Sequence, residues 1–253
     1  MGIFDSSLYR VRPLMETVEK DNSALTALLS LVGIPPLSAP QCYRYNGENC
    51  TEIQLKPTKK HLSALIDHMA TKNHAPASVK GKDRTELFFG DPQTRAKACA
   101  RAKQALEAQY GSLKSSDKAW FLFEGFSNPD IFIEGKDYVI VCEGKWTEPH
   151  LTTTTTHLSD KNEYRSQMVR HIQGALNHTN KKVYAFYIVD DSCAYKQALT
   201  KECFSNQLKK ETIGLEPDEE FKMIEAFYGY TTWQDIQNAI PSVIFLPKEK
   251  IKS

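Results

Sequence analysis

The sequence lacks the features that mark membrane-spanning, secreted or disulfide-stabilised proteins. No apolar run approaches the roughly 20 residues of a membrane-spanning helix, and residues 1–5 lack the basic-then-apolar pattern of a secretory signal. The six cysteines include no C-x-x-C pair, and two of them lie in predicted core elements. The sequence therefore predicts a cytoplasmic protein with reduced thiols, without membrane association, and argues against a zinc cluster or a disulfide framework.

An excess of positive charge is also missing. The chain has 32 Lys and Arg against 31 Asp and Glu, whereas proteins that bind nucleic acids avidly are usually basic. Three local basic clusters are candidates for phosphate contact, although each is more simply explained as solvated surface: residues 80–84, 95–101 and 181–182. Near neutrality thus argues against tight nucleic-acid binding but leaves room for the transient contact that a cleavage enzyme needs.

Internal repeats and long linkers are absent as well. At 253 residues, 41% hydrophobic and 25% charged, the chain can bury a core of its own. We expect a single α/β domain over residues 1–253, with a mainly helical N-terminal extension (1–90), a core (91–190) and a helical C-terminal addition (191–253). The sequence leaves the oligomeric state open, and a homo-oligomer is one option.

What the sequence does contain is Pro129-Asp130, followed by Glu143-Gly144-Lys145 at the end of the apolar run 138–142. Side chains alternate between the two faces of a strand, so Glu143 and Lys145 should emerge together while Gly144 points away. Residues 134–137 read as a hairpin turn that makes strands 131–133 and 138–142 neighbours, which brings Asp130 to the same place. Two carboxylates and a lysine at one strand end suit metal-assisted phosphodiester cleavage.

The E-x-K pattern alone is common, and this sequence has three copies, beginning at Glu134, Glu143 and Glu220. The first lies in the predicted turn and the third in an amphipathic helical pattern, where such spacing is usually a solvated face. Only the copy at Glu143 follows both a Pro-Asp and an apolar strand. The alternative for this copy is an ordinary salt bridge at an exposed strand end.

The pair Pro129-Asp130 and Glu143-Gly144-Lys145 resembles the PD-(D/E)xK motif of the restriction-endonuclease-like nuclease superfamily. The core of that superfamily runs helix, three strands, helix, strand, with a mixed sheet flanked by helices. The predicted elements match this order over roughly 100 residues: helix 93–110, strands 119–123, 131–133 and 138–146, helix 160–177 and strand 183–189. The resemblance implies an α/β fold of this type and a metal-dependent nuclease.

The resemblance also implies roles for individual residues. Asp130, Glu143 and the backbone carbonyl of Gly144 would hold Mg²⁺ or Mn²⁺, and Lys145 would orient the attacking water and stabilise the transition state. Branches of the superfamily add an acidic ligand, for which we favour Glu86; Glu107 and Glu124 are the other candidates.

Many members carry a glutamine on the helix after the E-x-K strand, and Gln167 lies at that position. On a helix Gln167 and His171 are one turn apart, on the shoulder of the apolar stripe, so both can face the site. An ordinary polar flanking residue is the alternative for Gln167. A packing or hydrogen-bonding role is the expectation for His171.

We therefore expect a Mg²⁺-dependent hydrolase that cuts nucleic acid, with DNA favoured over RNA and the choice between endonuclease and exonuclease open. One alternative is an inactive nucleic-acid-binding or assembly module of the same fold. Another is an unrelated α/β interaction protein.

The flanks of the predicted core are helical, with helices expected over residues 14–32, 59–72, 194–209, 217–228 and 232–240. Short strands are expected near residues 43–45 and 242–246. Five consecutive threonines, residues 152–156, offer almost no apolar area for a core, and we expect a mobile loop there at the mouth of the site.

Overall fold

The apolar run in the middle of the chain forms the central strand of a five-stranded sheet. The computed structural model describes residues 6–46, 53–71, 86, 90–110, 126–147, 152–157, 164–211 and 214–247. All seven residues of β3 (Tyr138–Gly144) are buried, as expected for a strand that is covered on both faces. No helix in the described ranges is both long and apolar enough to span a membrane.

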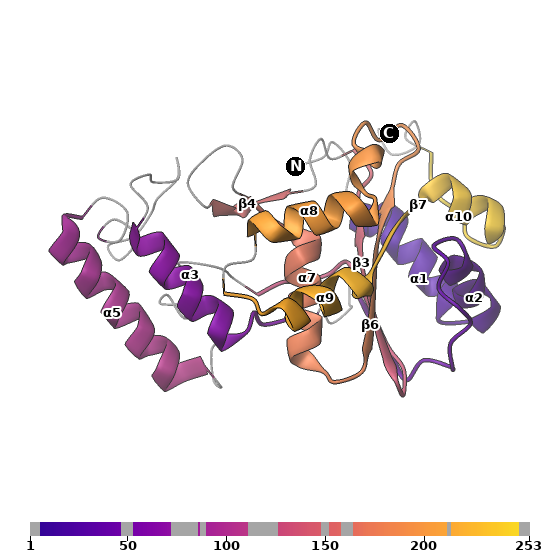
Figure 1. Cartoon of the computed structure of the whole chain (residues 1–253). Coiled ribbons are helices and arrows are strands. Elements are labelled where there is room, and N and C mark those ends of the chain that lie inside the picture. Colours follow the sequence, from indigo (N-terminus) through magenta and orange to yellow (C-terminus); the bar gives the residue numbers. More distant parts are fainter. Residues whose placement is uncertain are drawn as a thin grey trace.

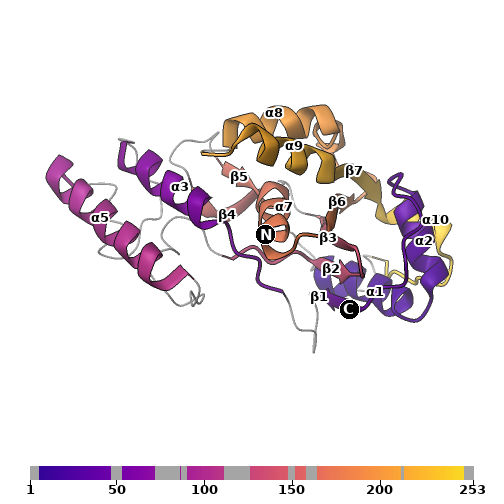
Figure 2. The ribbon, with the colours of Figure 1, turned by 60° about the horizontal axis from the view of Figure 1, so that its bottom comes forward.

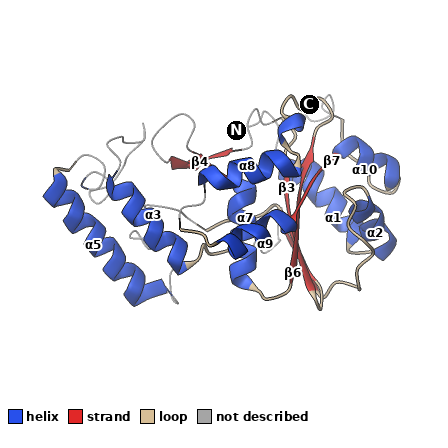
Figure 3. Cartoon of the chain, in the orientation of Figure 1, coloured by secondary structure: helices blue, strands red, loops and turns tan. Residues whose placement is uncertain are grey.

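The sheet has the strand order β1-β2-β3-β6-β7 and is mixed. Strands β1 (Cys42–Tyr45), β2 (Ile131–Glu134) and β3 form an antiparallel set. Strands β6 (Lys182–Val189) and β7 (Phe227–Thr232) continue from β3 in parallel. Figure 3 shows the strands of this sheet, in red, between two groups of helices. The predicted α/β class and the predicted hairpin between β2 and β3 are confirmed.

Helices cover both faces of the sheet (Figure 1). Side chains alternate along β3, so Ile140 and Cys142 join one apolar cluster while Val139 and Val141 join the other. The helices on the Ile140 face are α1 (Arg12–Val18), α2 (Asn22–Ser30) and α10 (Trp233–Ala239). Those on the Val141 face are α7 (Gln167–His178), α8 (Lys201–Glu211) and α9 (Pro217–Ala226).

Two further helices, α3 (Lys59–Thr71) and α5 (Pro92–Gln109), pack on each other. Figures 1 and 2 both place this pair at the end of the molecule opposite α1 and α2. Asp91 caps α5 by accepting hydrogen bonds from the backbone N–H groups of Gln93 and Thr94, at 2.8 and 2.9 Å. Both helices are confirmed where the sequence predicts them.

The sheet recruits a strand from the N-terminal region. β1 lies next to β2, with Tyr43 opposite Ile133, although the sequence indicates only a short strand near residues 43–45 in a helical extension. The predicted strand 119–123 lies outside the described residues. Part of the region assigned to the extension therefore belongs to the central sheet.

The threonine run is a strand, so the predicted loop is wrong. β4 (Thr152–His157) pairs antiparallel with β5 (Tyr164–Ser166), with His157 opposite Tyr164. Threonine is β-branched and favours extended backbone, and here that preference outweighs the lack of apolar area. The helix predicted over 160–177 begins at Gln167, because residues 164–166 form β5; residues 158–163 lie outside the described part.

Other differences concern element boundaries. The helix predicted over 14–32 is broken at residues 19–21, where Asp21 caps α2 by accepting a hydrogen bond from the Ser23 N–H at 2.8 Å; a π-helical turn η1 (Ser7–Val11) precedes α1. The helix predicted over 194–209 is a 3₁₀ turn η3 (Lys196–Ala198) followed by α8. The helix predicted over 217–228 ends at Ala226, where β7 begins, and residues 242–246 form no strand in the described structure.

Candidate active site at the carboxyl end of β3

Strand β3 delivers Glu143 and Lys145 to the same side of the sheet. Glu143 follows Val141 with the two-residue period of a strand and so faces α7, while Gly144 faces the opposite helices. A Cβ at Gly144 would lie 3.0 Å from the Trp233 ring and 3.1 Å from Val11, so the strand packs closely there. Beyond the strand, the Lys145 N–H donates to the carbonyl of Ile188 at 2.7 Å, which keeps Lys145 in line with β3.

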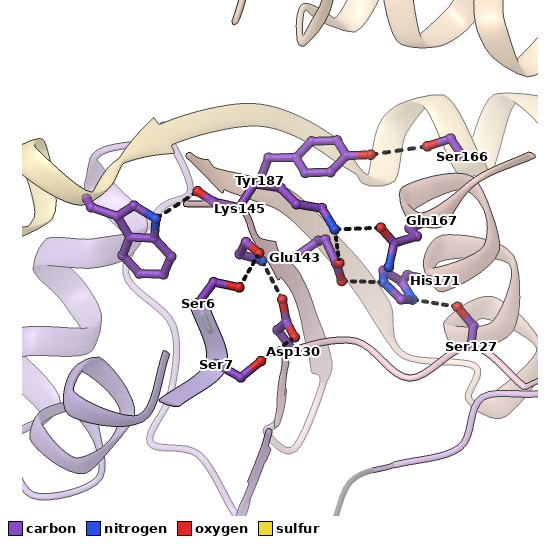
Figure 4. Close-up of polar contacts among 12 residues, drawn as sticks. Ser6, Ser7, Ser127, Asp130, Glu143, Lys145, Ser166, Gln167, His171 and Tyr187 are labelled. Carbon is purple, nitrogen blue, oxygen red and sulfur yellow. Dashed lines mark hydrogen bonds and ion pairs between the residues drawn. The ribbon is translucent and has the colours of Figure 1, made fainter. Parts of the chain in front are cut away.

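Glu143 is the centre of a buried polar cluster (Figure 4). Its Oε1 accepts a hydrogen bond from Lys145 Nζ at 2.7 Å, and its Oε2 lies 2.8 Å from His171 Nε2. Burial alone would raise the pKa of Glu143, but the Lys145 ammonium and the His171 hydrogen bond outweigh it and lower the pKa to about 2. Glu143 is therefore a carboxylate at neutral pH.

Asp130 is the residue before β2. Ile131, the first residue of β2, pairs with Cys142 of the antiparallel β3, so Asp130 lies across from Glu143. Its Oδ2 accepts the Gly144 N–H at 2.8 Å. Burial, followed by the charge of Glu143, raises the pKa of Asp130 to about 8. Two neighbouring carboxyl groups thus differ in charge at neutral pH, with Asp130 mainly protonated.

The start of η1 and the residue before it close one side of the cluster with two serines. The hydroxyl of Ser7 donates to Asp130 Oδ1 at 3.3 Å, and the hydroxyl of Ser6 donates to the carbonyl of Gly144 at 3.2 Å. Each of these hydroxyl groups therefore lies on an oxygen atom of a residue, Asp130 or Gly144, that is expected to bind a cation.

Lys145 is held between a carboxylate and an amide. Its Nζ donates to Glu143 Oε1 and, at 2.6 Å, to Oε1 of Gln167, the first residue of α7. The backbone behind it is fixed as well, because the Trp233 indole N–H donates to the Lys145 carbonyl at 2.9 Å. The ammonium group therefore has a defined position within the cluster.

The additional acidic candidates lie elsewhere. Glu86 pairs with Arg101 on α5, and Glu107 on α5 pairs with Lys59 on α3 at 2.5 Å. Glu124 lies outside the described residues. Within the described ranges no three His, Cys, Asp or Glu side chains form a metal-binding group. Of the expected ligands, the Asp130 and Glu143 carboxyl groups and the Gly144 carbonyl lie in one cluster.

The structure thus brings together Asp130, Glu143, Gly144, Lys145 and Gln167, and adds His171 to them. Sequence reasoning missed the serines Ser6, Ser7 and Ser127, which contact Gly144, Asp130 and His171. Isolated serines carry no spacing signal, and a contact such as Ser7 to Asp130 spans 123 residues of chain. Comparisons of the chain with protein-family models, with curated proteins and with solved structures found no match.

Proposed function

We propose that the protein is a Mg²⁺-dependent nuclease that hydrolyses phosphodiester bonds, with DNA favoured over RNA. The observation that carries the proposal is the burial of two carboxyl groups and a lysine together at the end of β3. Asp130, Glu143 and Lys145 are only 8%, 3% and 9% exposed.

Such burial argues against an ordinary salt bridge at a strand end. Exposed ion pairs cost little to form, whereas taking a charge out of water costs several kcal/mol even after the protein relaxes. Buried clusters of ionisable groups with strongly shifted pKa values are concentrated at functional sites. The opposite shifts of Asp130 and Glu143 fit this pattern.

The topology supports the resemblance to the restriction-endonuclease-like superfamily, with a different assignment of its first two elements. The order helix, three strands, helix, strand is met by α2, β1, β2, β3, α7 and β6, with the four strands in one mixed sheet, when the separate β4–β5 pair between β3 and α7 is counted as an insertion. In this assignment α3 and α5 belong to an insertion between β1 and β2, and the helix over residues 93–110 is not the first core helix.

The donor set fits a hard divalent cation. The Asp130 and Glu143 carboxyl groups and the Gly144 carbonyl are oxygen ligands of the kind that Mg²⁺ and Mn²⁺ take. Asp130 holds a proton next to the charged Glu143, and a cation would replace that proton and relieve the repulsion between the two carboxylates. When bound, the ion would polarise the scissile phosphate and make a bound water more acidic.

The remaining residues serve the charge that develops on the phosphate. Lys145 is already oriented by Glu143 and Gln167, so its ammonium group can stabilise negative charge in the transition state with little reorganisation. Gln167 accepts a hydrogen bond from Lys145. Because the Gln167 side chain is uncharged, it can orient the Lys145 ammonium group without neutralising its positive charge.

A cleavage assay with separate metals tests the function. Single-stranded DNA, double-stranded DNA and RNA are each incubated with Mg²⁺, Mn²⁺, Ca²⁺ or EDTA. We expect DNA hydrolysis with Mg²⁺ or Mn²⁺ and none with Ca²⁺ or EDTA, because Ca²⁺ is larger and more flexibly coordinated. Cleavage that persists in EDTA, or no cleavage of any substrate with any metal, contradicts the proposal; cation binding without cleavage indicates a binding module instead.

A further inference from the structure

His171 is a fully enclosed histidine that the cleavage chemistry described above does not use. It lies on α7, one turn after Gln167, and is 1% exposed. Its two ring nitrogens have different partners, with Nε2 2.8 Å from Glu143 Oε2 and Nδ1 2.5 Å from Ser127 Oγ. Figure 4 shows the ring lying between these two side chains.

The partners determine which nitrogen carries the proton. A neutral imidazole has a single N–H, on one of its two ring nitrogens, and the other nitrogen is an acceptor. The Glu143 carboxylate can only accept, which requires the N–H on Nε2. Nδ1 is then an acceptor, and the Ser127 hydroxyl donates to it.

Backbone contacts hold Ser127 in place for this task. Ser127 and Leu55 exchange two backbone hydrogen bonds, at 2.8 and 2.9 Å. The Arg170 guanidinium donates to the carbonyl of Phe126 at 3.1 Å, which ties the same segment to α7. Gly174 lies one turn after Arg170 on α7 and packs against Leu55. A Cβ at Gly174 would lie 2.7 Å from Leu55 Cβ, so no larger residue fits there without a shift.

We propose that His171, held in one tautomer by Ser127, is a positioning residue that orients the Glu143 carboxylate for the cation. This inference rests on the proposed nuclease function and deepens it. Lys145 fixes one carboxylate oxygen and His171 fixes the other, while each oxygen keeps a second lone pair for a metal ion. Hydrogen-bonded partners of this kind set the orientation and basicity of metal ligands.

Three variants separate the hydrogen bond from packing. His171→Leu removes both ring nitrogens, and His171→Gln keeps an N–H donor at a position that can reach Glu143. Ser127→Ala keeps the imidazole and removes only the hydroxyl that selects its tautomer. Unfolding by urea in EDTA measures the stability of each variant, and Ser127→Ala, the smallest change, provides the test if His171→Leu fails to fold.

Two readouts apply to each variant, Mn²⁺ affinity by titration and single-turnover cleavage of DNA with Mn²⁺. We expect His171→Leu to weaken Mn²⁺ binding by roughly 10–100-fold, the usual effect of losing a partner of a metal ligand. His171→Gln should recover most of that loss, and Ser127→Ala should fall between wild type and His171→Leu. In the metal-free wild type, ¹⁵N NMR of the His171 ring should show the proton on Nε2.

The possible results distinguish the two proposals. A proton on Nδ1, or equal Mn²⁺ affinity in wild type, His171→Gln and His171→Leu, overturns the positioning role while leaving the nuclease function standing. A wild-type protein that neither binds Mn²⁺ nor cleaves DNA overturns the proposed function, and the positioning role falls with it. Loss in His171→Leu with rescue in His171→Gln supports the positioning role.

Discussion

The carboxyl end of β3 and the outer helix pair α3–α5 both gather charged side chains, but one region buries them and the other leaves them in water. In the buried cluster Asp130, Glu143 and Lys145 are each less than a tenth exposed. In the outer pair, the side chains of Lys103 and Asp67 form an ion pair at 2.7 Å with 40% and 58% of their surface exposed. Similar pairs of residues therefore face very different electrostatic environments.

The difference in environment changes what each pair does for the protein. An exposed pair contributes about 0–1 kcal/mol, because water and salt screen it. A buried pair is hard to justify by stability, since apolar side chains of the same volume often serve the fold equally well or better. Charges that a protein keeps at the end of its central strand are better explained by chemistry than by folding.

The largest expected effect separates two copies of the same tripeptide. Glu143-Gly144-Lys145 is buried, whereas Glu134-Gly135-Lys136 lies at the hairpin turn with Lys136 exposed. Lys145→Ala should reduce single-turnover DNA cleavage by on the order of 10²–10³-fold, because it removes a preorganised donor to the transition state. Lys136→Ala, the matched control, should cleave like wild type.

Mn²⁺ titration of the same two variants checks the assigned role. Lys145→Ala should still bind Mn²⁺, because a lysine does not ligate the ion and removing its positive charge relieves a repulsion that offsets the lost hydrogen bond to Glu143. Equal cleavage by Lys145→Ala and Lys136→Ala would remove the distinction between the buried and the exposed tripeptide.

The second effect concerns pH and stability without metal. A free aspartate loses its proton near 3.8, whereas folding raises the pKa of Asp130 to about 8. The folded state holds one more proton between these values, so the free energy of unfolding should fall as pH rises from about 4 to about 8, by about 1.4 kcal/mol per pH unit at most. Asp130→Asn, which mimics the neutral acid, should flatten this slope.

Urea unfolding in EDTA at several pH values measures the slope. Glu143 contributes in a different window, because its pKa is lowered to about 2 and its stabilisation is lost only as pH falls below about 4.5. Asp67→Asn, at an exposed position of α3, is the matched control and should keep the wild-type slope. An unchanged slope in Asp130→Asn would mean that Asp130 is already ionised in the folded protein at pH 5–8.

The sequence predicts the part of the fold that is coded locally. The apolar run of β3 and the turn before it are each contained in a few consecutive residues, and both occur as predicted. The two-residue period of a strand also places Glu143 and Lys145 on one side. Gln167 and His171 reach that side because they are one helical turn apart, although their roles stay predictions.

The missing parts depend on contacts between distant segments. A short strand near residues 43–45 is predicted and found as β1, but no local pattern marks its place beside β2, where Tyr45 pairs with Ile131. Ser127 reaches His171 across 44 residues. The extra acidic ligand could not be chosen from the sequence for the same reason. Glu86 has the charge that a metal ligand needs, but it pairs with Arg101, and that contact depends on the tertiary structure.

The smallest expected effect belongs to the exposed pair. Lys103→Ala should change the free energy of unfolding by at most about 1 kcal/mol, and by less at high salt, because the Lys103–Asp67 attraction acts through water. DNA cleavage should stay at the wild-type level, since α5 lies away from the β3 site in Figures 1 and 2. A double-mutant cycle with Asp67→Ala isolates the interaction between the two side chains from the loss of either one. A coupling free energy of several kcal/mol, or a loss of cleavage in Lys103→Ala, would show that the outer helices hold charge as tightly as the buried cluster, and exposure would then fail to distinguish the two regions.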